Sequence, residues 1–165
     1  MLQHVTWSAF LPRTRSKTIF VLVTACYAFT AGALARAIVT AFGAPHPPDD
    51  AFPRGSLLFD VVDNLLFAPV VESLILIGTI ELLRWFRFPV SLQVACAAAV
   101  SASLHAFVST ALAFGVAPAF VIMSVAYVVW RRTSWKTGFV VVTSIHALLN
   151  LIPAIYNVSH ALRNT

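Results

Sequence analysis

The sequence predicts an all-α membrane protein, a polytopic helical bundle with about five transmembrane helices. Of its 165 residues, 59% are hydrophobic and only 10% are charged, whereas a soluble domain carries about a quarter charged residues. The mean hydropathy is +0.86. A soluble domain and a disordered chain are therefore nearly excluded. Because each transmembrane helix takes about 20 residues, the chain has room for roughly four to six spans in one domain.

Five apolar stretches account for the predicted spans. They are residues 18–40, 57–83, 90–112, 119–130 and 139–156. The segment 45–56 is expected to be a loop, because prolines at its density do not continue a helix. Further breaks are predicted at Phe88-Pro89 and at Gly115 with Pro118, since glycine and proline interrupt helices.

This pattern divides the chain into three segments. Residues 1–56 are expected to hold an N-terminal basic segment, the first transmembrane helix and the proline-rich loop. Residues 57–158 are expected to form the core of the bundle, and residues 159–165 a short polar tail. A cleaved signal peptide is the alternative for the first apolar stretch, because Ala33 and Ala35 resemble a signal-peptidase site.

The basic residues predict the orientation in the membrane. A net charge of +5 would suggest a nucleic-acid partner in a soluble protein, but here the Lys and Arg residues mostly lie between apolar stretches. With five spans, one side collects Arg13, Arg15, Lys17, Arg84, Arg87, Arg131, Arg132 and Lys136. The positive-inside rule then places the N terminus in the cytoplasm, and we expect the chain in the cell inner membrane. We expect the lipid bilayer as a partner and no nucleic acid.

Four polar side chains lie inside the predicted spans, where a charged group costs ~2.5–3.5 kcal/mol or more. They are Glu72, His105, His146 and Asn150. A single residue of this kind often serves only as an interhelical hydrogen-bonding group. Four of them on three spans favour a site, and His146 and Asn150, four residues apart, share one helix face. Pro69 removes a backbone hydrogen bond just before Glu72 and is expected to kink that helix.

The chemistry of these four groups suits hydrolysis. Water held between the carboxylate of Glu72 and the imidazole of His105 can be activated as a nucleophile. His146 and Asn150 can offer hydrogen-bond donors to an oxyanion, most effectively where water is scarce. The sequence therefore predicts an acid–base site inside the bundle.

Three motifs in order resemble the CAAX protease and bacteriocin-processing family, also called the Abi family, a group of glutamate-dependent intramembrane peptidases. Residues 68–72 (APVVE) are similar to its first motif, His105 to the end of its second, and residues 146–150 (HALLN) to its third. The resemblance covers about residues 57–156. It implies that Glu72 and His105 activate the attacking water and that His146 and Asn150 form the oxyanion site. The implied substrate is a peptide or protein at the membrane, and neither a cofactor nor a metal is expected.

The sequence also departs from the family pattern. Ser73 stands where a second Glu is usual, Ile77 where an Arg is usual, and Ser101 where a Phe is common. One alternative is therefore a non-catalytic membrane protein that binds a partner or a bacteriocin-like peptide, as an immunity or scaffold protein. The other is a metal-dependent peptidase, because the carboxylate and the two histidines together would suit zinc.

The charge asymmetry predicts the topology directly. Reporter fusions placed after Arg87 and after Arg132 should report the cytoplasm, because basic loops stay on that side of the membrane. A fusion within residues 46–54 should report the outside. A cytoplasmic signal from residues 46–54 would contradict both the orientation and the five-span arrangement.

Overall fold

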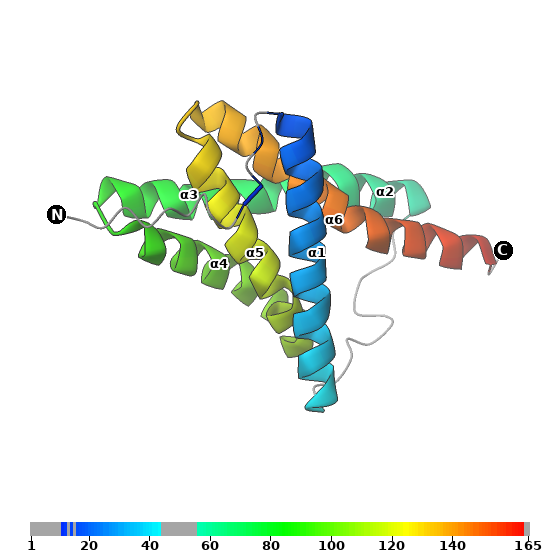
Figure 1. The fold of residues 1–165 in the computed structure, drawn as a ribbon. Coiled ribbons are helices and arrows are strands. Elements are labelled where there is room, and N and C mark those ends of the chain that lie inside the picture. Colours follow the sequence, from blue (N-terminus) through cyan, green and yellow to red (C-terminus); the bar gives the residue numbers. More distant parts are fainter. Residues whose placement is uncertain (1–10, 13, 15, 44–55, 164–165) are drawn as a thin grey trace.

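The computed structural model describes residues 11–12, 14, 16–43 and 56–163, and every regular element in these ranges is a helix (Figure 1). The elements are α1 (Lys17–Ala41), α2 (Leu57–Val62), the π-helix η2 (Asp63–Phe67), α3 (Ala68–Trp85), α4 (Val90–Ala106), α5 (Thr110–Trp130) and α6 (Trp135–Arg163). The predicted all-α fold class is confirmed. Arg13, Arg15 and most of the predicted loop 45–56 lie outside the described residues.

Four helical segments are long and apolar enough to cross a membrane. They are α1, the continuous helix Leu57–Trp85 formed by α2, η2 and α3, α5, and α6 as far as Ser159. Helix α4 is also apolar but has only 17 residues, the lower end of the range for a transmembrane helix. The chain thus has the architecture of an integral membrane protein, with four long apolar helices and one shorter one.

The predicted boundary between the third and fourth spans is wrong. The chain breaks between α4 and α5, around Phe107, and Gly115 and Pro118 both lie inside α5. Ser109 sets the start of α5, because its side chain accepts a hydrogen bond from the backbone N–H of Leu112 (3.3 Å). Pro118 removes only one backbone hydrogen bond, a loss that transmembrane helices tolerate.

Most of the predicted polar tail continues helix α6. Helix α6 continues through Arg163, so residues 159–163 belong to its last turns. Hydrogen bonding within the backbone continues past the last apolar stretch, and the decline in hydropathy there does not end the helix.

Glycine at position 115 allows a close helix contact. Helix α1 crosses α5 there, and a Cβ on Gly32 would lie 2.9 Å from the backbone oxygen of Gly115. A Cβ on Gly115 would lie 3.1 Å from the Cβ of Arg36. Further along the same pair, the rings of Phe20 and Trp130 meet edge to face at 5.2 Å. Small residues therefore set the distance between α1 and α5, as is usual between helices in a membrane.

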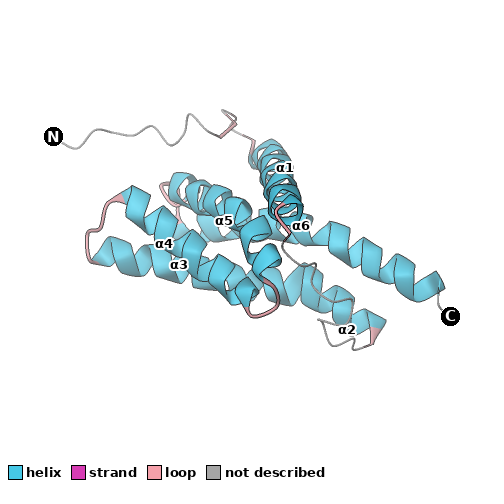
Figure 2. Ribbon diagram, turned by 90° about the horizontal axis from the view of Figure 1, so that it is seen from below, coloured by secondary structure: helices cyan, strands magenta, loops and turns pink. Residues whose placement is uncertain are grey.

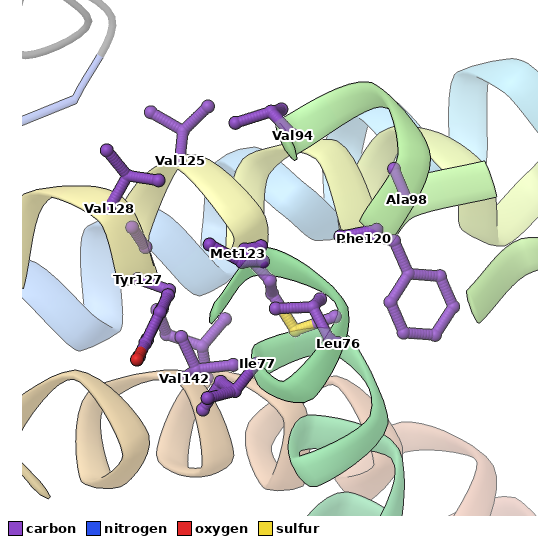
Figure 3. Packing of buried hydrophobic residues seen from close by; sticks show 14 of the residues in the cluster. Leu76, Ile77, Val94, Ala98, Phe120, Met123, Val125, Tyr127, Val128 and Val142 are labelled. Carbon is purple, nitrogen blue, oxygen red and sulfur yellow. The ribbon is translucent and has the colours of Figure 1, made fainter. Parts of the chain in front are cut away.

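Helix α5 is the centre of the bundle, and it contacts α1, α3, α4 and α6. Its buried side chains Phe120, Met123 and Tyr127 pack against Leu76 of α3 and Val142 of α6 (Figure 3). Helix α5 contains no charged residue, which fits its position between the other helices.

Helix α3 ends in a Schellman motif in which an arginine takes the place of the usual glycine. The N–H of Phe88 donates to the carbonyl of Leu83 (3.0 Å) and the N–H of Arg87 to that of Arg84 (2.9 Å), which is the Schellman pattern. The residue after the helix cap then takes a left-handed conformation, and here it is Arg87, with φ 58°. Glycine normally occupies this position, because a side chain in this conformation costs about 1–2 kcal/mol.

The contact between α1 and α5 can be tested with two alanine substitutions. Gly32→Ala should lower the free energy of unfolding by roughly 1–3 kcal/mol, because its Cβ meets a backbone oxygen that cannot rotate away. Gly78→Ala is the matched control, because nothing lies within 4 Å of its added Cβ. It should be neutral or stabilising by up to about 1 kcal/mol. Thermal unfolding in detergent measures both, and equal melting temperatures for the two variants would contradict the close crossing.

Candidate active site

Three helices bring three of the four predicted site residues together. Glu72 lies one turn into α3, His105 near the end of α4, and His146 in the middle of α6. The Oε2 atom of Glu72 is 3.6 Å from Nε2 of His105 and 3.6 Å from Nε2 of His146. The carboxylate therefore faces two imidazoles that come from different helices.

These distances suit a bridging molecule better than direct contact. At 3.6 Å an oxygen and a nitrogen are too far apart for a direct hydrogen bond, but both can reach one water molecule. Oε2 of Glu72 is itself buried and accepts no hydrogen bond from the described part of the chain. The side chains of Glu72 and His105 are 23% and 21% exposed and that of His146 only 7%, so His146 is the most buried of the three.

The backbone of α4 sets the tautomer of His105. Its Nδ1 lies 3.0 Å from the carbonyl oxygen of Ser101. Because a carbonyl only accepts hydrogen bonds, Nδ1 must carry the proton, and in the neutral ring Nε2 is then an acceptor. In the neutral form of His105, Nε2 and the Glu72 carboxylate are both acceptors, so one water molecule could donate a hydrogen to each of them.

Phe120 of α5 forms the inner wall of the site. Its ring centroid is 5.4 Å from that of His105 and 5.7 Å from that of His146, with an edge-on arrangement to the second ring (88°). Phe120 is 2% exposed, so it excludes water from that side. Sequence reasoning missed this residue, because a phenylalanine in an apolar helix carries no signal that separates it from ordinary core residues.

Asn150 is the predicted site residue that the structure does not bring to the carboxylate. Its Nδ2 donates a hydrogen bond to the backbone carbonyl of Asn64 (3.0 Å). Asn64 lies in η2, where each carbonyl is paired with the N–H five residues later, and that residue is Pro69, which has no N–H. Asn150 therefore satisfies a carbonyl that the helix itself leaves without a donor.

The positions that depart from the family pattern lie in the core. Ser73 is 1% exposed and Ile77 is 7% exposed. Ile77 belongs to the hydrophobic cluster (Figure 3). The family has an acid and an arginine at these places, whereas here a small and an apolar side chain pack without charge.

Among the residues that the structure describes, no group of three or more His, Cys, Asp or Glu side chains is placed to hold a metal ion.

Comparison with models of protein families found no matching family. Comparisons with curated proteins and with solved structures found no match either. The resemblance described above rests on the three motifs at residues 68–72, 105 and 146–150.

The role of Asn150 can be tested through stability. Asn150→Ala should lower the free energy of unfolding by about 1–3 kcal/mol, because it leaves the carbonyl of Asn64 without a donor. The control is Asn157→Ala, since Asn157 is exposed on the same helix and its loss should change stability little. Thermal unfolding in detergent compares the two variants, and an Asn150→Ala protein as stable as the control would contradict the role of this hydrogen bond.

Proposed function

We propose that this protein is an intramembrane endopeptidase that uses Glu72 and His105 to activate water. The observation that carries the proposal is the carboxylate of Glu72 facing Nε2 of both His105 and His146 at 3.6 Å. The motif resemblance supports the same reaction class. The substrate would be a peptide or protein that reaches the site from the bilayer or its edge.

The reaction balances with the groups present. A water molecule between Glu72 and His105 gives one proton to the carboxylate and attacks the carbonyl carbon of the peptide bond. Glu72 then returns this proton to the leaving amine, so that the products are a carboxylic acid and an amine. His105, fixed by Ser101, orients the water through its unprotonated Nε2.

The oxyanion formed during the attack needs a donor. His146 is the most buried of the three side chains, and an imidazole N–H donating from this position would stabilise the negative charge strongly, because little water competes. Asn150 already donates to the carbonyl of Asn64. In our proposal it therefore acts by holding α6 in place next to η2.

A non-catalytic role is the competing proposal. The observation that favours it is the uncharged packing of Ser73 and Ile77, at the positions where the family has an acid and an arginine. Such a protein would bind a membrane partner or a bacteriocin-like peptide at the same site. A Glu72→Gln variant that keeps the full biological function of the protein would favour this role.

The peptidase proposal predicts which variants lose activity. The purified chain in liposomes is incubated with a library of peptides that contain apolar segments, and mass spectrometry detects new peptide ends. Glu72→Gln and His105→Ala should each lower the cleavage rate by about 10²–10⁴-fold, the range for loss of a general acid or base. Glu81→Gln is the matched control, because it makes the same change at the other carboxylate of α3 and should leave cleavage near the wild-type rate.

Two results would overturn the assignment. Cleavage that survives Glu72→Gln would show that this carboxylate is not the base. The reaction proposed above uses only side chains and water, so it should also survive strong chelators. Stoichiometric zinc in the purified protein, with cleavage lost on its removal, would favour the metal-dependent alternative.

A further inference from the structure

Two turns of the bundle carry most of its described basic side chains at one end. The turn between α3 and α4 follows Arg84 and contains Arg87, and the turn between α5 and α6 contains Arg131 and Arg132, with Lys136 at the start of α6. Both views place these two turns on the same side of the molecule (Figures 1 and 2). These basic residues have no part in the proposed reaction, so a role for them is independent of the proposed function.

The carboxylate of Glu81, near the end of α3, joins the turn after α3 to the turn after α5. Oε1 of Glu81 accepts hydrogen bonds from the hydroxyl of Tyr127 (2.8 Å) and from Nη1 of Arg131 (3.2 Å), and its Oε2 pairs with Arg84 (2.6 Å). Nη2 of Arg131 donates to Oε1 of Gln93 (3.3 Å). The side-chain amide of Gln93 in turn donates to the carbonyl of Phe88 (2.7 Å), in the turn between α3 and α4.

This network leaves three cations without an acidic partner. Glu81 is fully used by Arg84 and Arg131, and in the described part of the chain no acidic group pairs with Arg87, Arg132 or Lys136. All three residues are exposed. Because Arg131 bonds to Glu81 and Gln93, and Gln93 to Phe88, the network links the two turns that carry these cations.

The backbone of Arg87 indicates that its side chain has a purpose outside the fold. It occupies the left-handed position of the Schellman motif, with φ 58°, where glycine would relieve the strain. The two Schellman hydrogen bonds satisfy helix carbonyls in this turn, but among the described residues the Arg87 side chain forms no ion pair. Strain of this kind, kept at an exposed charged residue, points to a ligand.

Aromatic side chains on the same two turns indicate what the ligand is. Trp85 is 79% exposed, Phe86 65% and Trp135 59%. Exposed tryptophans beside basic residues at the end of apolar helices are typical of the level of the lipid headgroups. Clustered Lys and Arg at that level attract anionic phospholipids.

We propose that Arg87, Arg132 and Lys136 form a binding surface for the phosphate of an anionic phospholipid headgroup. The guanidinium and ammonium groups donate charge-assisted hydrogen bonds to the phosphate oxygens. Trp85, Phe86 and Trp135 lie against the lipid around it. We call the three cations and the three aromatic residues together the headgroup surface.

The test uses the full chain in a mild detergent, with phosphatidylglycerol as the anionic lipid and phosphatidylcholine as the neutral one. Native mass spectrometry measures the affinity for each lipid. The wild type should bind phosphatidylglycerol more tightly than phosphatidylcholine. Each of Arg87→Gln, Arg132→Gln and Lys136→Gln should lower the affinity for phosphatidylglycerol about fivefold. This factor is roughly what one surface cation contributes to binding an anionic lipid. Arg36→Gln is the matched control, because Arg36 lies beside Gly115, near the opposite end of α5 from Arg131 and Arg132, and it should bind as the wild type does.

Arg87→Gly separates ligand binding from folding. Glycine suits the left-handed position, so this variant should melt at or above the wild-type temperature while binding phosphatidylglycerol about fivefold more weakly. Inorganic phosphate at the same concentration should not displace the lipid, which distinguishes a headgroup from free phosphate. Equal binding of the two lipids, unchanged binding by Arg87→Gly, or preferential capture of an acidic peptide such as polyglutamate would overturn the proposal.

Discussion

The missing N–H of Pro69 is the constraint on which the candidate active site depends. It leaves the carbonyl of Asn64 without a backbone donor inside the long helix formed by α2, η2 and α3. Asn150 of α6 supplies that donor, and His146 lies one turn earlier on the same helix face. This hydrogen bond between α6 and η2 therefore contributes, together with the packing of α6, to the rotation that turns His146 toward Glu72.

The two carboxylates of α3 show how hydrogen bonding separates a reactive group from a structural one. Both Oε1 and Oε2 of Glu81 are occupied, by Tyr127, Arg131 and Arg84, so this carboxylate holds helices together. Oε2 of Glu72 faces two imidazoles without a direct hydrogen bond in the described chain, so it keeps an acceptor for water or substrate.

Composition and hydropathy were sufficient for the fold class, because the cost of leaving polar backbone in lipid restricts such a chain to helices. They were not sufficient for the helix boundaries. Gly115 and Pro118 are expected to break a helix when read alone, yet α5 passes through both, since the close contact with α1 requires Gly115. The start of α5 depends on the side chain of Ser109, a local signal weaker than a glycine or a proline.

The sequence by itself identified Glu72, His105 and His146 as unusual, because each is costly in an apolar helix and therefore needs a reason. Only the tertiary structure decided how they are used. Periodicity places a residue on one face of its own helix but does not say which neighbour that face meets. The pairing of Asn150 with a backbone carbonyl, the contact of Phe120 with both imidazoles and the junction at Glu81 all join helices far apart in the sequence. Such contacts follow from how the helices pack, which no local pattern encodes.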